Sequence, residues 1–233
     1  LRPLLFLAEP ERAHAWALEA LRRVDRLGAA QAHHRAGALA PLLSNLRGGA
    51  DDLPPETPVE LLGLRFPNRV GLAAGFDKDA SCVDGLGGLG FGFIEVGTVT
   101  PRPQDGQPKP RVFRLPAAEA LINRMGFPND GAARVAERLM RRKYPGVVGV
   151  NIGKNADTPL ERAVDDYVAC LETLHAVADY VAVNVSSPNT VGLRDLQDAE
   201  RLAPILAALL ECRARLEKRG SRHVPLLVKL SPD

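Results

Sequence analysis

The chain has 233 residues, of which 45% are hydrophobic and 25% charged, and its formal net charge is +2. This composition is typical of a folded globular protein and excludes a disordered or fibrous chain, while the near-neutral charge disfavours nucleic acid as the main partner. Three scattered cysteines, Cys82, Cys170 and Cys212, exclude a disulfide framework and a cysteine-rich metal site, and they favour a reducing compartment.

Residues 1–50 are predicted to form a basic, mainly helical extension. This segment holds seven Arg and four acidic residues, so the positive excess of the whole chain lies in it. One amphipathic helix is expected to start near Pro10 and to end near Gly28. Its expected apolar face, at 3–4 spacing, is Ala13, Trp16, Ala20, Val24 and Leu27. Two interpretations stay open: a cap that packs on the main domain, or a cap that also lies on a membrane surface.

Residues 51–58 are rich in proline and acidic residues and are predicted to be a linker, followed by a main domain over residues 59–233. Within that domain, short apolar runs alternate with helical stretches. The predicted strands are Val70–Ala74, Phe93–Thr98, Val147–Ile152, Tyr180–Ser186 and Val224–Leu230. The predicted helices between them cover residues 79–88, 129–143, 160–178 and 195–219. This alternation is typical of βαβ units in a parallel sheet.

Two further segments accompany this pattern. Val59–Phe66, with a turn at Gly63, predicts a β-hairpin ahead of the first unit. Residues 101–127 form a long insertion, with one short strand expected at Arg111–Leu115. Loops of this length inside compact domains are usually functional.

The polar residues within the strands favour a (β/α)8 barrel over a doubly wound sheet. In Tyr180–Ser186 the valines share one face, while Asn184 and Ser186 share the other, and Val147–Ile152 likewise sets Asn151 opposite an apolar face. The strands of a doubly wound sheet are covered by helices on both faces and should be apolar throughout. In addition, no Gly-x-Gly-x-x-Gly follows the first strand, which weakens the dinucleotide-binding version of that sheet.

Three polar side chains near the carboxyl ends of different strands, Asn151, Asn184 and Lys229, are expected to meet at the barrel mouth. A buried amide or ammonium needs a partner, because leaving it unpaired is costly. A structural partner stays open for any one of the three, whereas a polar ligand accounts for all three together. No acidic cluster accompanies them, so a metal is not expected.

Further candidates lie in loops at the same mouth. The small residues of Ala73–Lys78 let backbone approach a flat ligand closely. Thr98 adds a hydroxyl, Ser186–Thr190 adds a hydroxyl and an amide, and Asn123–Phe127 ends the insertion. Taken singly, each segment is equally well an ordinary turn. No Gly-x-Ser-x-Gly elbow and no nearby His surround Ser187, so a hydrolase triad is not expected.

The motifs around these residues, in their order along the chain, resemble those of the dihydroorotate dehydrogenases. They are Gly71–Asp79, Glu95–Pro103, Leu121–Phe127, Val150–Asn155, Val183–Thr190 and Val228–Lys229. Each motif is weak alone, but jointly they are specific and span nearly the whole chain. Ser187 stands where the soluble class carries cysteine, so the chain is similar to class 2, the membrane-associated, quinone-dependent enzymes. The basic N-terminal segment with Glu11–His14 resembles the extension of that class.

The resemblance implies a (β/α)8 barrel that holds FMN at its C-terminal mouth and oxidises dihydroorotate to orotate in de novo pyrimidine biosynthesis, with a quinone as terminal electron acceptor. Ser187 would be the catalytic base. The implied FMN contacts are Ala74, Gly75, Phe76, Asp77, Lys78, Thr98, Asn151, Asn184 and Lys229. The implied substrate contacts are Lys78, Asn123, Arg124, Met125, Gly126, Phe127, Asn184 and Asn189. His14 and Arg114 would face the quinone.

The resemblance also sets expectations about length and location. A complete barrel needs eight βα units and typically ~250 residues, so the chain is expected to be truncated at the C-terminus. Apolar runs are all far shorter than the ~20 residues of a membrane-spanning helix. The resemblance thus implies a peripheral membrane protein, attached through its N-terminal helices to the cytoplasmic face of a bacterial inner membrane. Two alternatives stay open: a non-catalytic fragment, and a related FMN barrel acting on another dihydropyrimidine.

Overall fold

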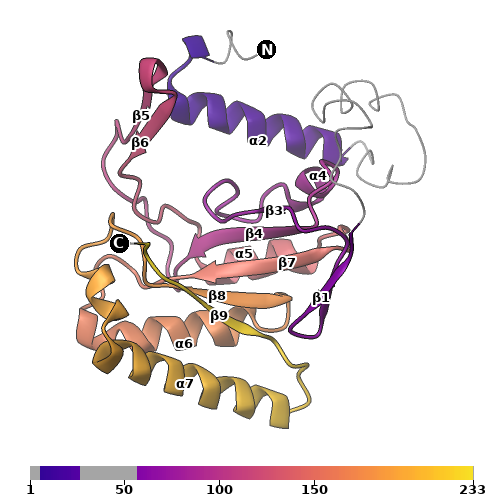
Figure 1. Ribbon diagram of the computed structural model, residues 1–233, viewed down its shortest axis with the longest axis vertical. Helices are drawn as coiled ribbons and strands as arrows, with labels where there is room; N and C mark the ends of the chain where they lie inside the picture. Colours follow the sequence, from indigo (N-terminus) through magenta and orange to yellow (C-terminus); the bar gives the residue numbers. More distant parts are fainter. Residues whose placement is uncertain (1–5, 27–56, 233) are drawn as a thin grey trace.

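The computed structural model, which describes residues 6–26 and 57–232, has a five-stranded parallel sheet at its centre (Figure 1). In spatial order the strands are β3 (Gly71–Leu72), β4 (Phe93–Val99), β7 (Val147–Ile152), β8 (Tyr180–Asn184) and β9 (Leu226–Lys229). Each strand neighbours the next one along the chain, whereas a doubly wound sheet reverses its order at a switch point. The five predicted strands are therefore confirmed, in the order of a barrel wall.

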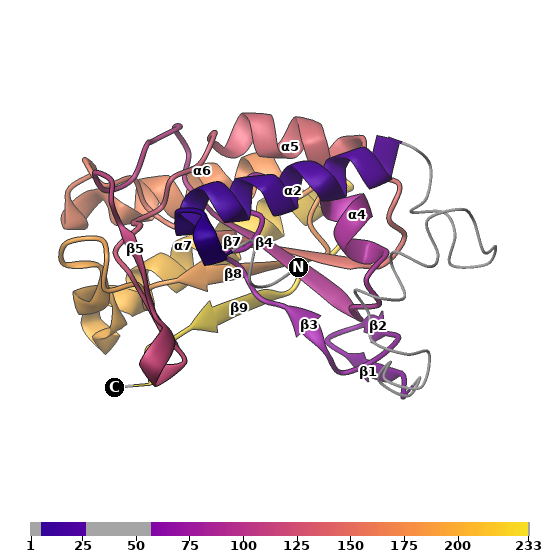
Figure 2. The ribbon, with the colours of Figure 1, turned by 90° about the horizontal axis from the view of Figure 1, so that it is seen from above.

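The helices of the parallel units cover one side of this sheet. They are α4 (Val83–Gly87), α5 (Ala132–Met140), α6 (Ala163–Leu174) and α7 (Ala199–Lys218), with short 3-10 turns at Leu160–Arg162 and Leu193–Gln197 before α6 and α7. Figure 2 shows α5, α6 and α7 together on one side of the strands. Helices on a single face are typical of a (β/α)8 barrel. The predicted fold class is confirmed, with the five strands forming an open sheet rather than a closed barrel.

Alternate residues of the central strands face these helices and build the main core. In β7, Val148, Val150 and Ile152 are completely buried, and in β8 the same holds for Val181 and Val183. This is the all-apolar face that the period-2 pattern predicts. At about 1.5–3 kcal/mol per fully buried aliphatic side chain, these rows anchor the strands whose other face carries the polar residues.

The other face of the sheet is closed at one end by the predicted hairpin, β1 (Val59–Leu61) and β2 (Leu64–Phe66). Val147, Tyr180 and Ala182 form a small buried cluster there, against which side chains of β2 pack. Apolar side chains fill this end of the sheet face, and the polar residues lie at the opposite end, where the strands finish.

The insertion forms a second antiparallel hairpin, β5 (Val112–Leu115) and β6 (Ala120–Asn123), joined through a 3-10 turn at Pro116–Ala118. The strand expected at 111–115 is confirmed, but β6 was not predicted. All four residues of β6 are exposed, so no alternation of apolar and polar residues marks this strand. Pairing with β5 along the backbone fixes it instead.

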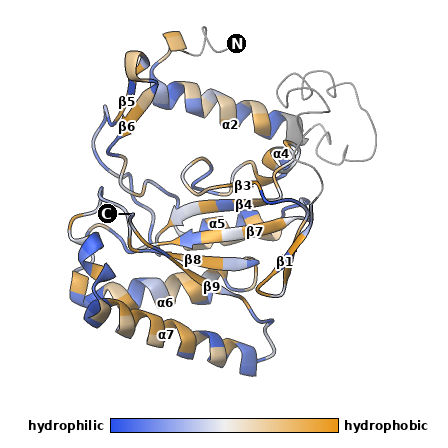
Figure 3. Cartoon of the chain, viewed as in Figure 1, coloured by the Kyte–Doolittle hydropathy of each residue, from blue (hydrophilic) through white to orange (hydrophobic). Residues whose placement is uncertain are grey.

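Helix α2 (Pro10–Arg26) confirms the predicted N-terminal helix, and Ala13 of the predicted apolar face is buried, but the prediction is wrong for Trp16 and Ala20. Trp16 is 52% exposed and Ala20 is also exposed, whereas Leu18 and Leu21 pack against the main core. Figure 3 shows hydrophobic residues together with hydrophilic ones along α2.

A close approach between α2 and α4 explains this orientation. A Cβ atom on Gly85 would lie only 2.6 Å from the carbonyl oxygen of Leu21, so glycine lets the two helix backbones meet. The contact turns Leu21 toward the core and leaves Trp16 outside, where the Arg12 guanidinium lies 5.7 Å from its ring centroid.

Several N-terminal expectations lie outside the described residues: the helix end at Gly28, the rest of the extension over 27–50, and the linker over 51–56. The same holds for Leu27 and for the side chain of Val24. Among the helices that the structure describes, none is long and apolar enough to cross a bilayer.

Candidate active site

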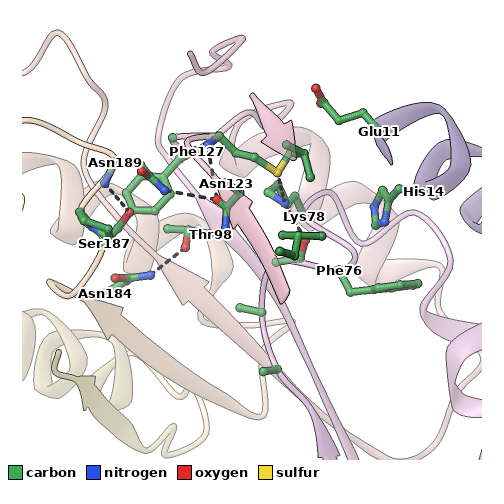
Figure 4. Close-up of a pocket in the computed structure, with 18 of the residues that line it drawn as sticks. Glu11, His14, Phe76, Lys78, Thr98, Asn123, Phe127, Asn184, Ser187 and Asn189 are labelled. Atoms are coloured by element: carbon green, nitrogen blue, oxygen red, sulfur yellow. Dashed lines mark hydrogen bonds between the residues drawn. The ribbon is translucent and has the colours of Figure 1, made fainter. Parts of the chain in front are cut away.

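A cavity of about 690 Å³ lies at the carboxyl ends of the parallel strands. It is bounded by the loops after β3 and β8, by the β5–β6 hairpin with the loop that follows it, and by the first turns of α2. Figure 4 shows Ser187, Asn189 and Asn184 at one end of this cavity and His14 at the other, with Lys78 between them. Of the sequence-predicted site residues, all but Asp77, Arg124 and Asn151 line this cavity.

The turn after β3 presents backbone to the cavity. Ala73, Ala74 and Gly75 line it, followed by Phe76. Gly75 has a φ of 111°, and a Cβ atom on it would meet no other atom within 4 Å, so this backbone borders open space. The Gly75 N–H donates to the Gly97 carbonyl at 2.9 Å and ties the turn to β4. A flat ligand can therefore lie directly against the chain here.

Asp77 does not send its side chain into the cavity. Its carboxylate is buried and accepts the backbone N–H groups of Ser81 at 2.8 Å and Cys82 at 2.9 Å. These amides belong to the turn that directly precedes α4, so Asp77 fixes the backbone between the β3 loop and this helix. The structure gives this predicted cofactor residue a structural position outside the lining of the cavity.

Lys78 brings a cation to the middle of the cavity. Its Nζ donates to the Gly75 carbonyl at 2.6 Å and lies 3.8 Å from the Met125 sulfur. Burial lowers the pKa of Lys78, while the charge of Asp79 opposes that change. Among the residues that the structure describes, no carboxylate lies within ion-pair distance of this Nζ. A bound anion would therefore offset the cost of burying the ammonium group.

The strand ends carry a buried row of polar side chains, Thr98, Asn151 and Asn184. The Thr98 hydroxyl donates to Asn151 Oδ1, and Asn184 Nδ2 donates to both that Oδ1 and Thr98 Oγ1, at 3.0 Å each. Thr98 and Asn184 line the cavity, whereas Asn151 lies beneath them. Lys229, the register partner of Asn184 on β9, lines the cavity too. The structure thus brings the three predicted strand-end residues together, with Asn151 one layer below.

The loop after β6 forms the facing wall. Asn123, Met125, Gly126 and Phe127 line the cavity, but Arg124 points away from it. The Arg124 guanidinium is exposed and donates to the Pro110 carbonyl at 3.0 Å. The motif itself did not reveal that Arg124 points away from the cavity while its neighbours line it.

Two side chains that were not predicted bind the backbone of this loop. The Phe127 carbonyl accepts Gln104 Nε2 at 3.0 Å and Asn129 Nδ2 at 2.8 Å. Asn155 in turn donates to Gln104 Oε1 at 2.9 Å. All three belong to or follow quoted motifs, but nothing in the sequence distinguishes a buried bracing amide from an exposed one.

Ser187 lies half-buried in the loop after β8. The backbone N–H of Asn189 donates to Ser187 Oγ at 3.3 Å, and Asn189 Nδ2 donates to Asn123 Oδ1 at 3.3 Å (Figure 4). In the described part of the chain, Ser187 Oγ is thus a hydrogen-bond acceptor, which leaves its O–H available to the cavity.

His14 and Arg114 line the α2 end of the same cavity. The His14 ring meets Phe76 edge-on, with centroids 4.9 Å apart. Burial, and then the charge of Lys78, lower the pKa of His14, so the imidazole is neutral at pH 7. Arg114 Nη1 donates to the Ala8 carbonyl at 2.7 Å, and its guanidinium lies 4.6 Å from the Phe6 ring centroid.

A buried ion pair that was not predicted joins α2 to the insertion. The guanidinium of Arg111 donates to both carboxylate oxygens of Glu11, at 2.9–3.2 Å. Its Nη1 donates to the carbonyls of Asp105 at 2.6 Å and Gln107 at 2.9 Å. The contact spans 100 residues of sequence, and no local pattern marks it.

Within residues 6–26 and 57–232, no group of three or more His, Cys, Asp or Glu side chains could hold a metal ion. The three cysteines are buried and form no disulfide. Burial raises the pKa of Cys82 and Cys170, so both stay protonated at neutral pH.

Comparison with known proteins identifies relatives of the whole chain. A family model described as dihydroorotate dehydrogenase matches residues 57–233. The chain is 52% identical over 232 residues to a protein of Pseudomonas fluorescens (strain Pf0-1), and 52% identical over 233 residues to one of Chromobacterium violaceum. Both are named dihydroorotate dehydrogenase (quinone). All of this chain is covered, and it spans 63% of the length of each relative.

Solved structures give the same answer. The crystal structure of DHODH from Eimeria tenella in complex with ferulenol matches with a TM-score of 0.72 at 38% identity, over 85% of this chain and 60% of that one. The ligand-free form from the same organism matches with a TM-score of 0.71 at 40% identity, over 83% of this chain and 60% of that one.

Proposed function

The chain belongs to the dihydroorotate dehydrogenase family, and from this premise we propose that the protein oxidises dihydroorotate to orotate, with FMN as hydride acceptor and a quinone as terminal electron acceptor. One observation carries the proposal most directly. Lys78 holds a half-buried ammonium group in a cavity with several carboxamides in its wall, and no carboxylate among the described residues lies within ion-pair distance of it. Dihydroorotate is a flat anion with amide edges, which matches that set of groups.

The residues present also fit FMN. The side chains of Ala73 and Ala74 are small, and the Gly75 backbone borders open space, so this wall can accept a flat ring system. Thr98, Asn184 and Lys229 supply a hydroxyl, an amide and an amine beside it. When bound, FMN supplies a two-electron acceptor for the hydride that leaves the substrate.

Substrate would be held by Lys78 after β3, by Asn123 at the end of β6, and by Asn184 and Asn189 at and after the end of β8, so that three separate segments face it. The Lys78 ammonium would pair with the anionic charge of the substrate. Anchoring from several sides orients a flat substrate against the wall at Gly75, and such orientation lowers the barrier to reaction.

Ser187 would take the proton from substrate C5. A serine hydroxyl is a weak base at its ordinary pKa, so it must pass the proton on as it accepts one. The Asn189 N–H donates to Ser187 Oγ and would stabilise negative charge on that oxygen. Because Ser187 makes this contact as acceptor, its own proton would leave to water in the cavity.

Electrons would leave toward a quinone at the α2 end, where His14, Arg114 and Phe76 line the cavity. The N-terminal segment would rest on a membrane surface at the cytoplasmic face of a bacterial inner membrane. Leu7 is 86% exposed, and Phe6 and Trp16 are about half exposed, with Arg114 beside Phe6 and Arg12 beside Trp16. Exposed apolar groups with basic residues favour a lipid–water interface.

Substrate discrimination tests this function. The purified full-length protein should reduce a ubiquinone analogue with dihydroorotate, and dihydrouracil, which lacks the carboxylate, should be a poor donor. Orotate formed should equal quinone reduced. Equal rates with both donors, or no orotate, would exclude the proposed reaction and favour another dihydropyrimidine or a non-catalytic protein.

A further inference from the structure

Glu95 is a partly buried carboxylate to which the proposed reaction gives no task. Alternation along β4 turns Ile94 and Val96 toward the helices and Glu95 toward the other face of the sheet. Its two oxygens have different partners. Oε1 accepts Asn151 Nδ2 at 2.9 Å, and Oε2 accepts the Tyr180 hydroxyl at 3.0 Å. Both donors are neutral groups.

Glycine at position 149 makes this arrangement possible. Gly149 is the register partner of both Glu95 and Tyr180, so it lies between them on β7. A Cβ atom on Gly149 would lie 2.0 Å from the Tyr180 ring. The ring therefore crosses a whole strand over this glycine to reach Glu95. Burial, and then the Glu95 charge, raise the pKa of Tyr180, which keeps its hydroxyl a donor.

The carboxylate sets the direction of every hydrogen bond above it. A carboxylate only accepts, so Asn151 must turn its Nδ2 toward Glu95 and its Oδ1 toward the cavity. That Oδ1 accepts the Thr98 hydroxyl and Asn184 Nδ2. Asn184 is then left with its Oδ1 pointing onward.

The last hydrogen bonds in this series lie in the loop that contains Ser187. Asn184 Oδ1 accepts both the backbone N–H and the hydroxyl of Ser186, each at 3.1 Å. Ser186 directly precedes Ser187. If the Asn151 amide turned over, its Nδ2 would face Asn184 Nδ2, and two donors would oppose each other. Asn184 would then have to turn over as well, and its oxygen would no longer accept from Ser186.

We propose that Glu95 is a positioning residue: it fixes the amide of Asn151 and, through Thr98 and Asn184, the placement of the Ser186–Ser187 segment against the substrate. This role rests on the proposed function of Ser187. Glu95 would thus influence the reaction from inside the sheet without touching the substrate.

Glu95→Gln should disturb this order while keeping the side-chain volume. The amide has one acceptor oxygen where the carboxylate had two, so Asn151 Nδ2 and the Tyr180 hydroxyl can no longer both donate to position 95, and the amide of Asn151 is no longer held in a single orientation. In the flavin-loaded, full-length enzyme, kcat per bound flavin should fall roughly ten- to hundredfold, as for a small misplacement of reacting groups. Glu137→Gln, at an exposed position on α5, is the matched control and should leave kcat unchanged.

A reciprocal exchange separates positioning from bulk stability. In E95Q/N151D the amide introduced at position 95 would donate to the carboxylate introduced at position 151. That carboxylate would still accept from Thr98 and Asn184, so the donor order returns. N151D alone sets two carboxylates side by side and should be the most damaged variant. The double variant should recover at least about tenfold in kcat over the worse single variant, with a non-additive coupling.

Flavin content and melting temperature, measured on the same four proteins, do not depend on turnover. Recovery of both in the double variant supports the fixed amide order, whereas losses that merely add overturn it. Unchanged kcat in E95Q, with only a lower melting temperature, also overturns the positioning role. Failure of the unmodified enzyme to oxidise dihydroorotate would instead refute the proposed function, and the melting data would still decide on the amide order.

Discussion

Arg111→Lys should detach the N-terminal helix from the insertion that carries the substrate loop. The side chains of Arg111 and Glu11 are only 7% and 13% exposed, so solvent cannot replace their contacts. Arginine reaches the Glu11 carboxylate with one edge and the carbonyls of Asp105 and Gln107 with another. Lysine carries all its donors on one nitrogen and cannot serve both places.

The size of the effect follows from the hydrogen bonds that lysine cannot make at this position. At about 1.5–3 kcal/mol for each hydrogen bond to a charged group, losing two with partial relaxation should cost ~3 kcal/mol of unfolding free energy. At ~2–4 °C per kcal/mol, the melting temperature should fall by roughly 6–12 °C. The KM for dihydroorotate should also rise, because the Arg111 and Gln107 backbones bond to Arg124 and Met125 in the substrate loop.

Thermal denaturation and steady-state kinetics of the full-length enzyme measure both effects. The matched control is Arg23→Lys, since Arg23 is 73% exposed and pairs with Glu19 one turn away on α2. That pair should contribute no more than ~0.5 kcal/mol. Equal shifts for the two variants, or an unchanged KM in Arg111→Lys, would refute the view that the buried ion pair couples α2 to the site.

Three further outcomes are expected. Ser187→Ala should lower kcat by roughly 10²-fold with little change in melting temperature, as for the loss of a positioned base; near-normal turnover would remove Ser187 from that role. Gly149→Ala should lower the melting temperature clearly, because its Cβ would collide with the Tyr180 ring, and an unchanged transition would contradict the packing described. Burial lowers the pKa of His14 below 6.5, so the native state binds fewer protons than the unfolded chain near that pH, and stability should fall as the pH drops through 6.5. His14→Gln should reduce this dependence of stability on pH without removing it, because burial also lowers the pKa of His175. Denaturant titrations between about pH 5 and 7 measure the dependence, and an identical slope in the variant would contradict a buried neutral His14.

The strands were predictable because each pairs an apolar face with a polar one, and the polar residues fall where the strands end. Val147–Ile152 and Tyr180–Asn184 show this best, and their alternation also separated a barrel from a doubly wound sheet. The convergence of Asn151, Asn184 and Lys229 followed from that geometry alone.

The directions of individual side chains were less predictable. Asp77 and Arg124 sit within matching motifs, yet one binds backbone N–H groups of the turn before α4 and the other donates to a backbone carbonyl outside the cavity. The apolar face of α2 was misassigned at Trp16 and Ala20 because its prediction considered the helix in isolation. Its orientation is set by Gly85, which lies far from Leu21 in the sequence.

Long-range polar contacts carried no local signal at all. The partners of Glu95 lie 56 and 85 residues away in sequence, and Glu11, the acidic partner of Arg111, lies 100 residues away. Periodicity reports the environment of a residue, not the identity of its partner. Such pairs emerge only when the strands and helices are assembled.

The proposed reaction is tested most directly by anaerobic titration of the purified full-length protein with dihydroorotate, followed by the visible absorbance of its flavin and by orotate released. We predict loss of the flavin absorbance with one orotate formed per bound flavin, and its return on addition of a quinone. A colourless protein, or a flavin absorbance that dihydroorotate leaves unchanged, would contradict the proposed reaction.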